Sequence, residues 1–259
     1  MPTFLFDKII FGPVRSRRLG VSLGINLLPV DSKLCSFDCI YCECGLNPDH
    51  RDKKAELPTR AKVASDLEQK LSDMVKNNMP PDVITFAGNG EPTLHPDFAR
   101  IIDDTVALRN KYCKEARIAV LSNASRLNKK DIFDALLKVD DNIQKLDSGL
   151  DETIKILDRP NYKFNIEQTV KDLERFNGKV IIQTMFVKGE FEGRHIDNTT
   201  DEDIASWLEL LKRIKPESVM IYTIERDTPI DTLYKVPLND LRRIAGIAER
   251  AGFKTQVSG

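Results

Sequence analysis

Short apolar runs rich in valine and isoleucine alternate along the chain with longer segments whose apolar residues recur at helical spacing. Several of the short runs lack strict alternation of apolar and polar residues, which is typical of strands buried on both faces. The runs that predict strands are residues 21–28, 83–86, 117–122, 143–147, 180–187 and 218–222. The segments that predict helices are residues 60–76, 97–111, 130–138, 166–176, 201–214 and 241–251.

This regular alternation predicts an α/β fold with parallel strands. A closed eight-unit barrel takes about 250 residues, and only six units are visible in this chain of 259. We therefore predict an open, partial (β/α)6 TIM-like barrel in a single domain, with residues 1–20 as an N-terminal arm and residues 21–259 as the core domain. A doubly wound flat sheet is the alternative. In either fold the functional site should lie at the carboxyl ends of the strands.

Composition and charge narrow the class of protein. Apolar residues make up 41% of the chain and charged residues 31%, which excludes a collagen-like or disordered chain. Lys and Arg number 39 against 40 Asp and Glu, so bulk charge gives no argument for a nucleic-acid or membrane partner. No apolar run approaches the ~18 residues needed to span a bilayer, and the N-terminus lacks the features of a signal peptide. We expect a cytoplasmic protein with no membrane partner.

Four of the five cysteines lie within ten residues, at Cys35, Cys39, Cys42 and Cys44, directly after the first predicted strand. Such a cluster indicates metal or redox chemistry, because a disulfide framework spreads its cysteines over a small secreted domain. In one interpretation the C-x3-C-x2-C spacing holds a [4Fe-4S] cluster with one iron left open. In another, Cys44 closes a structural zinc site; zinc sites usually use separated C-x2-C pairs, which are absent, so the spacing favours the cluster. Unliganded thiols are the third interpretation.

The same segment also carries a family resemblance. With Tyr41 as the aromatic residue, the C-x3-C-x-aromatic-C motif resembles the radical S-adenosylmethionine (SAM) superfamily. A second match follows the second predicted strand, where residues 88–92 resemble the superfamily's G-G-E-P stretch, which binds the methionine amino group. Asn89 stands in place of the usual second glycine. Taken without the cysteines, this stretch also reads as a turn between a strand and a helix.

The resemblance extends over nearly the whole chain. Residues 11–20, 145–149, 159–160 and 183–187 look like one branch of the superfamily, a group of short Fe–S oxidoreductases. That branch is similar to the radical enzymes that build wybutosine on tRNA. Those tRNA enzymes carry additional upstream cysteines for a second cluster, whereas this chain has no cysteine before Cys35.

The resemblance implies a reaction and its cofactors. Cys35, Cys39 and Cys42 would hold one [4Fe-4S] cluster, and the methionine end of SAM would chelate the iron that they leave free. Reduction by a protein such as flavodoxin or ferredoxin would then cleave SAM to methionine and a 5'-deoxyadenosyl radical. This radical abstracts hydrogen from an unidentified substrate. The alternatives are modification of a tRNA base by the same chemistry and a non-catalytic binding module stabilised by zinc.

The resemblance also implies the cofactor contacts, which should come from loops at the strand ends. Ser122 and Asn123 are equally compatible with a turn after the strand. Asp147 is also compatible with a helix cap or a salt-bridge partner. Gln183 is polar within an apolar strand and would be costly to bury unpaired. The residues expected at the cofactor are Tyr41 at the adenine, Gly88, Asn89, Gly90 and Glu91 at the amino group, and Ser122, Asn123, Asp147 and Gln183.

Other residues have open roles. Cys44 is a spare thiol, a ligand or a reactive group, and Cys113 and His95 are expected to be structural. The polar segment 188–200 is either a lid or a surface excursion. The three arginines that either grip an anion or form a solvated arm are Arg15, Arg17 and Arg18.

Overall fold

The computed structural model of the chain describes residues 4–16, 20–47 and 55–259. Its largest element is an eight-stranded sheet with the strand order β1-β2-β3-β4-β5-β6-β9-β11. All neighbouring strands are parallel except β1, which pairs antiparallel with β2. The strands are β1 (Ile10–Ser16), β2 (Gly20–Ile25), β3 (Val83–Phe86), β4 (Arg117–Ser122), β5 (Asp141–Lys145), β6 (Ile181–Met185), β9 (Ser218–Tyr222) and β11 (Thr255–Ser258).

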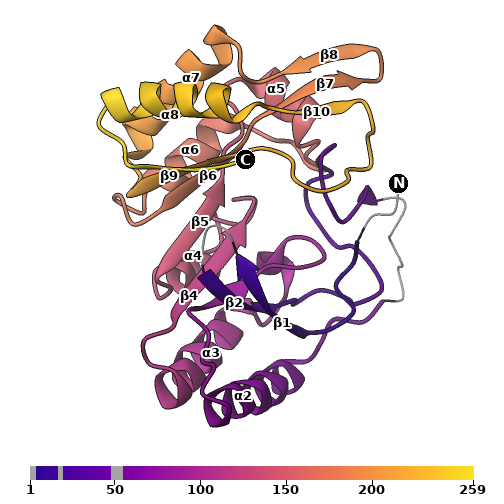
Figure 1. The fold of residues 1–259 in the computed structure, drawn as a ribbon, viewed down its shortest axis with the longest axis vertical. Helices are drawn as coiled ribbons and strands as arrows, with labels where there is room; N and C mark the ends of the chain where they lie inside the picture. Colours follow the sequence, from indigo (N-terminus) through magenta and orange to yellow (C-terminus); the bar gives the residue numbers. More distant parts are fainter. Residues whose placement is uncertain (1–3, 17–19, 48–54) are drawn as a thin grey trace.

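The predicted partial barrel of parallel strands is confirmed. β1 and β11 lie at opposite edges of the curled sheet and do not pair, so the described part of the barrel stays open (Figure 1). Each of the six apolar runs overlaps a strand. The sequence pattern missed β1, which is interrupted by Gly12-Pro13, and β11, whose four residues include a single apolar one. β11 adds a seventh parallel strand beside β9.

Helices follow most of the parallel strands, and their ends obey ordinary capping chemistry. The Thr59 side chain accepts a hydrogen bond from the Lys62 N–H, and Thr200 caps its helix as predicted, through the Asp203 N–H. The helices are α2 (Arg60–Lys76), α3 (Phe98–Tyr112), α4 (Lys130–Leu136), α5 (Asp151–Leu157), α6 (Ile166–Glu174), α7 (Asp201–Ile214) and α8 (Leu238–Arg250), with a short 3-10 turn, η1 (Pro92–Leu94), after β3. The pattern missed α5.

Both faces of the sheet are apolar. On β3, Ile84 and Phe86 belong to the large core shared with the helices, whereas Val83 joins a smaller cluster on the opposite face with Ala119 and Ile143. Successive residues of a strand point to opposite faces, so a strand buried on both sides shows no polar alternation. This arrangement explains the continuous apolar runs in the sequence.

The segment 188–200 is neither an irregular lid nor a plain excursion. It forms most of a hairpin of β7 (Val187–Phe191) and β8 (Arg194–Asp197), and β10 (Leu233–Lys235) joins β7 to make a second, antiparallel sheet. Glu192 and Gly193 both have positive φ, at 49° and 72°, as a two-residue hairpin turn requires. The sequence did not predict these strands, because polar side chains on the exposed face of the hairpin interrupt the apolar run.

Two loops from neighbouring strands are joined through their backbones. The Leu34 N–H donates to the Asn89 carbonyl at 2.9 Å, and the Glu91 N–H donates to the Leu34 carbonyl at 3.0 Å. Between these bonds lies Gly90, with φ at +136°, and a Cβ at that position would stand 1.9 Å from the Leu34 oxygen. Only glycine permits this approach. The bridge therefore places the cysteine segment, which begins at Cys35, beside the loop that follows β3.

We predict that Gly90→Ala lowers the free energy of unfolding by about 2–4 kcal/mol, because the new methyl group pushes the two loops apart. Gly193→Ala is the matched control, since Gly193 also has positive φ but a Cβ added there would meet no atom within 4 Å. It should lose about 1 kcal/mol. Urea unfolding of both variants measures the difference, and equal losses would contradict this account of the bridge.

Candidate functional site

The carboxyl ends of the parallel strands open into one cavity of about 400 Å³. Four strands place their final residue in its wall: Ser122 of β4, Lys145 of β5, Met185 of β6 and Tyr222 of β9. This is the edge at which β/α folds carry their functional sites, as the sequence predicted. The other residues of the wall are Phe6, Cys35, Phe37, Cys39, Tyr41, Cys42, Glu43, Cys44, Ala87, Gly88, Gly90, Glu91, Leu121, Asn123, Ile143 and Gln183.

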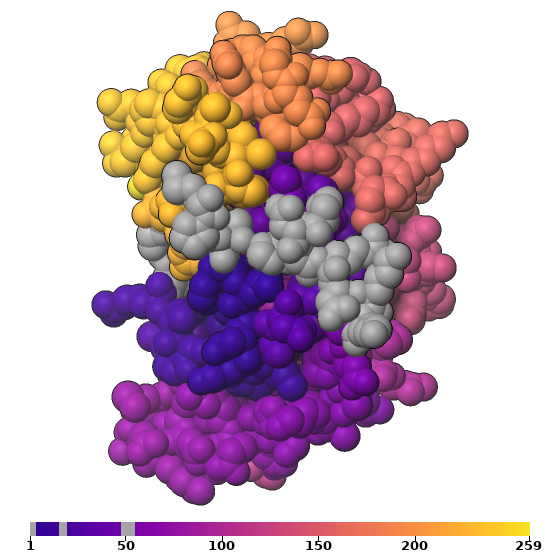
Figure 2. Space-filling model, turned by 90° about the vertical axis from the view of Figure 1, so that its right-hand side faces the viewer, coloured from indigo at the N-terminus to yellow at the C-terminus, as the bar shows by residue number. Residues whose placement is uncertain are grey.

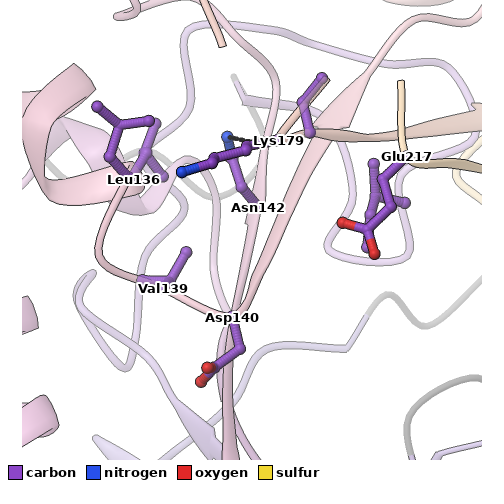
Figure 3. A pocket seen from close by; sticks show the side chains of 9 residues that line it. Leu136, Val139, Asp140, Asn142, Lys179 and Glu217 are labelled. Carbon is purple, nitrogen blue, oxygen red and sulfur yellow. Dashed lines mark hydrogen bonds between the residues drawn. The ribbon is translucent and has the colours of Figure 1, made fainter. Parts of the chain in front are cut away.

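A second hollow, of about 290 Å³, lies at the opposite end of the sheet (Figure 3). Ile181 is the first residue of β6, and Glu217 directly precedes β9. The Asn142 side chain reaches across to the Lys179 carbonyl at 3.4 Å. None of the predicted site residues lines this hollow.

Three of the cavity's thiols belong to the predicted metal-binding motif. Cys35, Cys39 and Cys42 are free cysteines, and each of them lines the cavity. The Cys39 thiol donates to Asp158 Oδ1 at 3.2 Å, and Cys35 Sγ accepts from the Phe37 N–H at 3.4 Å. The segment thus lines one cavity with three sulfurs.

The three thiols differ in acidity. Burial raises the pKa of Cys35 to about 12 and raises the pKa of Cys39 well above its usual value. A hydrogen bond from the Cys44 thiol is the largest influence on Cys42, and together with the nearby charge of Lys33 it lowers the pKa of Cys42 to about 6. Cys42 is therefore the thiol of the three that most readily gives up its proton. The resulting thiolate is the form of cysteine that binds metal.

A buried cation lies behind the cysteines. Lys33 is 2% exposed, and its Nζ donates to the Gly45 carbonyl and lies 3.7 Å from Asp38 Oδ1. Burial alone would lower the pKa of Lys33, but negative charge on Cys42 and its neighbours outweighs that effect and raises it. The ammonium group therefore stays charged, and it can offset the charge that thiolates bring into a buried site.

The loop after β3 brings Glu91 into the wall. Its Oε1 accepts from the N–H of Thr93 at 3.1 Å and from the Thr93 hydroxyl at 2.5 Å, and its Oε2 accepts from the N–H of Asn123 at 2.6 Å. Burial raises the pKa of Glu91, partly offset by these hydrogen bonds. The carboxylate thus ties the loop after β3 to the loop after β4.

Asn89, which replaces the expected glycine, does not line the cavity. Its side-chain oxygen accepts from the Phe6 N–H at 2.8 Å, and its amide nitrogen donates to the carbonyls of Phe6 and Pro29. Asn26 Oδ1 in turn accepts from the Asn89 N–H. The side chain therefore fastens the N-terminal segment, drawn in indigo on the face shown in Figure 2, against the loop after β3.

A buried charged network lies beside Cys39. Lys145 Nζ contacts Tyr41 Oη at 2.5 Å and Asp147 Oδ2 at 3.1 Å, and the Tyr41 hydroxyl donates to Asp147 and Asp158. Burial would lower the pKa of Lys145, but Asp147 and the other partners raise it well above its usual value. Burial, followed by the charge of Asp147, raises the pKa of Asp158 to about 7.

The structure brings most of the predicted cofactor residues together at the cavity, but it does not place all of them in the cavity wall. Asp147 lies outside the cavity wall, and its Oδ1 accepts from the Met185 N–H at 2.9 Å. Gln183 lies in the wall, and its amide donates to the Tyr222 hydroxyl at 2.7 Å. The predicted residues that line the cavity are Tyr41, Gly88, Gly90, Glu91, Ser122, Asn123 and Gln183, with Cys35, Cys39 and Cys42.

The residues expected to be structural lie away from the cavity wall. The buried His95 has its Nε2 at 2.9 Å from the Pro58 carbonyl, and its Nδ1 accepts from the Asp97 N–H. Cys113 is buried at the end of α3. Arg15 is exposed on β1, and Arg17 and Arg18 lie outside the described residues.

Sequence reasoning missed three residues of the site. Lys145 and Tyr222 each end a strand in the wall, and Asp158 contacts both Cys39 and Tyr41. Lys145 stands two residues before Asp147, a spacing that places two strand residues on one face. Asp158 carries no comparable signal, because 119 residues separate it from the thiol that it contacts.

Two negative observations apply to the described residues. No α-helix there combines membrane-spanning length with sufficient apolar character. Within the same ranges, no three side chains among cysteine, histidine, aspartate and glutamate gather around one point that could hold a metal ion.

Comparison with known proteins identifies relatives of similar sequence. A protein called GTPase Obg from Brachyspira hyodysenteriae is 32% identical over 228 residues, which are 86% of this chain and 31% of that protein. A UPF0026 protein of Synechocystis sp. is 30% identical over 226 residues, 85% of this chain and 77% of the relative. A UPF0026 protein of Methanocaldococcus jannaschii is 29% identical over 219 residues, 83% of this chain and 63% of the relative. The chain therefore spans less than two thirds of two of these relatives.

Solved structures share the fold at low sequence identity. A radical SAM methyltransferase from Sphaerobacter thermophilus has a TM-score of 0.67 at 14% identity, covering 92% of this chain and 65% of that one. Streptococcus suis SuiB bound to S-adenosylmethionine has a TM-score of 0.62 at 19% identity, covering 91% and 50%. An archaeal TYW1 has a TM-score of 0.51 at 15% identity, covering 88% and 71%.

The sequence profile of the radical SAM superfamily matches residues 30–201. This range includes the cysteine segment, the glycine-rich loop after β3 and the ends of β4, β5 and β6. The match covers more than half of the chain, and the family implies a [4Fe-4S] cluster and SAM as cofactors. The chain belongs to the radical SAM superfamily.

Proposed function

We propose that the chain is a radical SAM enzyme with one [4Fe-4S] cluster on Cys35, Cys39 and Cys42. The observation that carries the proposal is the single cavity into which these three thiols and the glycine-rich loop both open. In this proposal SAM binds in the same cavity. A one-electron donor such as flavodoxin or ferredoxin reduces the cluster.

The residues present fit these groups. Three thiols of one short loop are soft ligands suited to an Fe–S cluster, and the buried ammonium of Lys33 offsets their charge. Gly88 and Gly90 line the cavity with backbone atoms alone, because a Cβ at Gly88 would stand 2.3 Å from Asn26 Oδ1 and a Cβ at Gly90 1.9 Å from the Leu34 oxygen. When bound and reduced, the cluster supplies the electron that cleaves SAM to methionine and the 5'-deoxyadenosyl radical, which takes a hydrogen atom from the substrate.

The chain's own residues bind and orient the cofactor. We assign the Gly88–Glu91 loop to the methionine amino group, and Ser122 with Asn123 to the methionine and ribose. Tyr41 would lie against the adenine, held in place through its hydroxyl by Asp147 and Asp158. Asp147 thereby acts on the cofactor through Tyr41 and Lys145 as a positioning residue, while Gln183 and Tyr222, joined by a hydrogen bond, form a polar part of the wall.

The apolar part of the wall excludes water. Phe6, Leu121, Ile143 and Met185 contribute apolar surface to the cavity. A dry site strengthens electrostatic contacts and protects a reactive radical from side reactions. The fold therefore supplies both the polar contacts at the strand ends and the apolar cover around them.

Production of 5'-deoxyadenosine tests the reaction class. The protein is reconstituted without oxygen and supplied with dithionite and SAM, and the nucleoside is quantified by mass. We expect about four irons per chain and 5'-deoxyadenosine that is lost in Cys35→Ala, Cys39→Ala and Cys42→Ala. Cys113→Ala is the matched control and should behave as wild type. Zinc in place of iron would instead support the alternative of a metal-stabilised binding module.

Lys33→Met should lower the reduction potential of the cluster by roughly 100 mV, the Coulomb effect of one charge several ångströms away at an effective dielectric constant near 20. Removing the cation disfavours the more negative, reduced cluster. EPR-monitored redox titration measures the shift in protein with full iron content. Lys130→Met on the exposed surface of α4 is the control and should leave the potential unchanged. An unchanged or higher potential in Lys33→Met would refute this role.

Glu91→Ala should weaken SAM binding and lower the free energy of unfolding by about 2 kcal/mol, because the buried N–H groups of Thr93 and Asn123 lose their acceptor. Equilibrium dialysis with labelled SAM measures the affinity, and urea unfolding measures the stability. Glu115→Ala, at a surface position before β4, is the control. Wild-type affinity in Glu91→Ala would remove Glu91 from the cofactor site.

A further inference from the structure

Cys44 is the thiol of the cavity wall to which the proposed function gives no role. It is 8% exposed, and its thiol donates to the Gly88 carbonyl at 3.6 Å. The fourth sulfur therefore lies between a proposed cluster ligand and the loop proposed to bind the methionine end of SAM.

A tight turn fixes Cys44 in this position. The Cys42 N–H donates to the Cys39 carbonyl at 3.1 Å, and the Gly45 N–H donates to the Cys42 carbonyl at 2.9 Å. The buried ammonium of Lys33 donates to the Gly45 carbonyl. Because the backbone is held on both sides of Cys44, its sulfur stays at the cavity wall that Cys42 also lines.

Contacts from outside the cavity also hold the turn. The Glu43 carboxylate pairs with Arg226 at 2.7 Å, and the Glu43 carbonyl accepts from the Phe4 N–H at 3.0 Å. These contacts engage Glu43, the residue between Cys42 and Cys44. The turn is thus anchored on both its buried and its exposed side.

The chemistry of the wall favours Cys44 as a further ligand. Three thiolates leave one iron of a [4Fe-4S] cluster without a protein ligand, and iron in such clusters prefers thiolate. Glu91, the buried carboxylate on the same side, already accepts hydrogen bonds on both oxygens, from Thr93 and Asn123. Cys44 offers the soft donor that the open iron lacks.

We propose that Cys44 is the fourth ligand of the cluster in the cofactor-free protein and that SAM displaces it, an inference that rests on the proposed function. On binding iron, Cys44 releases its thiol proton to cavity water. When SAM binds, its ammonium group gives up a proton as the nitrogen takes the iron, and the released Cys44 thiolate takes up a proton. No electron moves in either step. The exchange keeps all four irons ligated until the cofactor arrives.

Mössbauer spectra of the wild-type protein, reconstituted with 57Fe, test the exchange directly. We expect four thiolate-ligated irons without SAM and one distinct iron after SAM is added. A distinct, non-thiolate iron already present in most of the molecules without SAM would overturn the proposal. This measurement needs no variant, so it stands even if substitutions of Cys44 impair folding.

Variants supply the second readout. Cys44→Ala and Cys44→Ser are compared with Cys113→Ala, a control that removes a buried thiol outside the cavity wall. Brief treatment with ferricyanide strips an unprotected iron, and the [3Fe-4S] product is counted by EPR. We expect at least a several-fold larger [3Fe-4S] signal in both Cys44 variants than in wild type or Cys113→Ala, and the difference should disappear when SAM is present.

The affinity for SAM distinguishes a Cys44 that binds the iron from a Cys44 that only supports the loop. If the thiolate holds the iron nine-tenths of the time, removing it tightens SAM binding about tenfold. A Cys44 that only supports the loop would give weaker binding on substitution, and that result would overturn the proposal, as would equal [3Fe-4S] yields. Failure of the proposed function is recognised separately, because the wild-type protein would then hold no [4Fe-4S] cluster at all.

Discussion

The structure of the site depends on one backbone contact, the bridge between Leu34 and Gly90. It joins the loop after β2 to the loop after β3, although the two residues are far apart in the chain. Glu91, the next residue, continues the connection by accepting the Asn123 N–H in the loop after β4. Three neighbouring strand ends are thus linked in series, and the cysteine segment starts at the first link. A change at Gly90 therefore acts on the cysteines and on the glycine-rich loop together.

The second constraint is the balance of buried charge. Lys33 lies behind the cysteines, and Lys145 lies in the cavity wall among Tyr41, Asp147 and Asp158. Burying an ammonium group is costly unless it is paired, so each lysine is held where acidic groups surround it. The result is a cavity with two largely buried cations near the cysteines, suited to the anionic cluster and the carboxylate-bearing cofactor of the proposed function.

The sequence predicted the parts of the molecule that follow from local pattern. Strands buried on both faces appear as continuous apolar runs, so β3 and β4 were found almost to the residue. The cysteine and glycine-rich motifs were also local, and most of their residues line the cavity. Asp158 could not be found, because its role depends on α5 ending beside Cys39, and α5 buries only Ile154 and Leu157, which are too few to show a helical period. The β7–β8 hairpin was not predicted for a different reason. One of its faces is exposed, so polar residues interrupt the apolar pattern of its strands.

Asn89, which replaces a glycine of the family motif, adds a second constraint on the loop after β3 by binding the backbone of Phe6. A glycine there would leave the backbone of Phe6 without the two hydrogen bonds that Asn89 now supplies. Phe6 forms part of the cavity wall and stacks on Phe11 at a centroid distance of 4.0 Å, and Phe11 in turn packs over Gly24 of β2. The amide thus connects the glycine-rich loop to an aromatic cover that is anchored on the sheet. Because the Asn89 side chain does not line the cavity, this chain gains the cover while Gly88 and Gly90 still line the cavity with backbone alone.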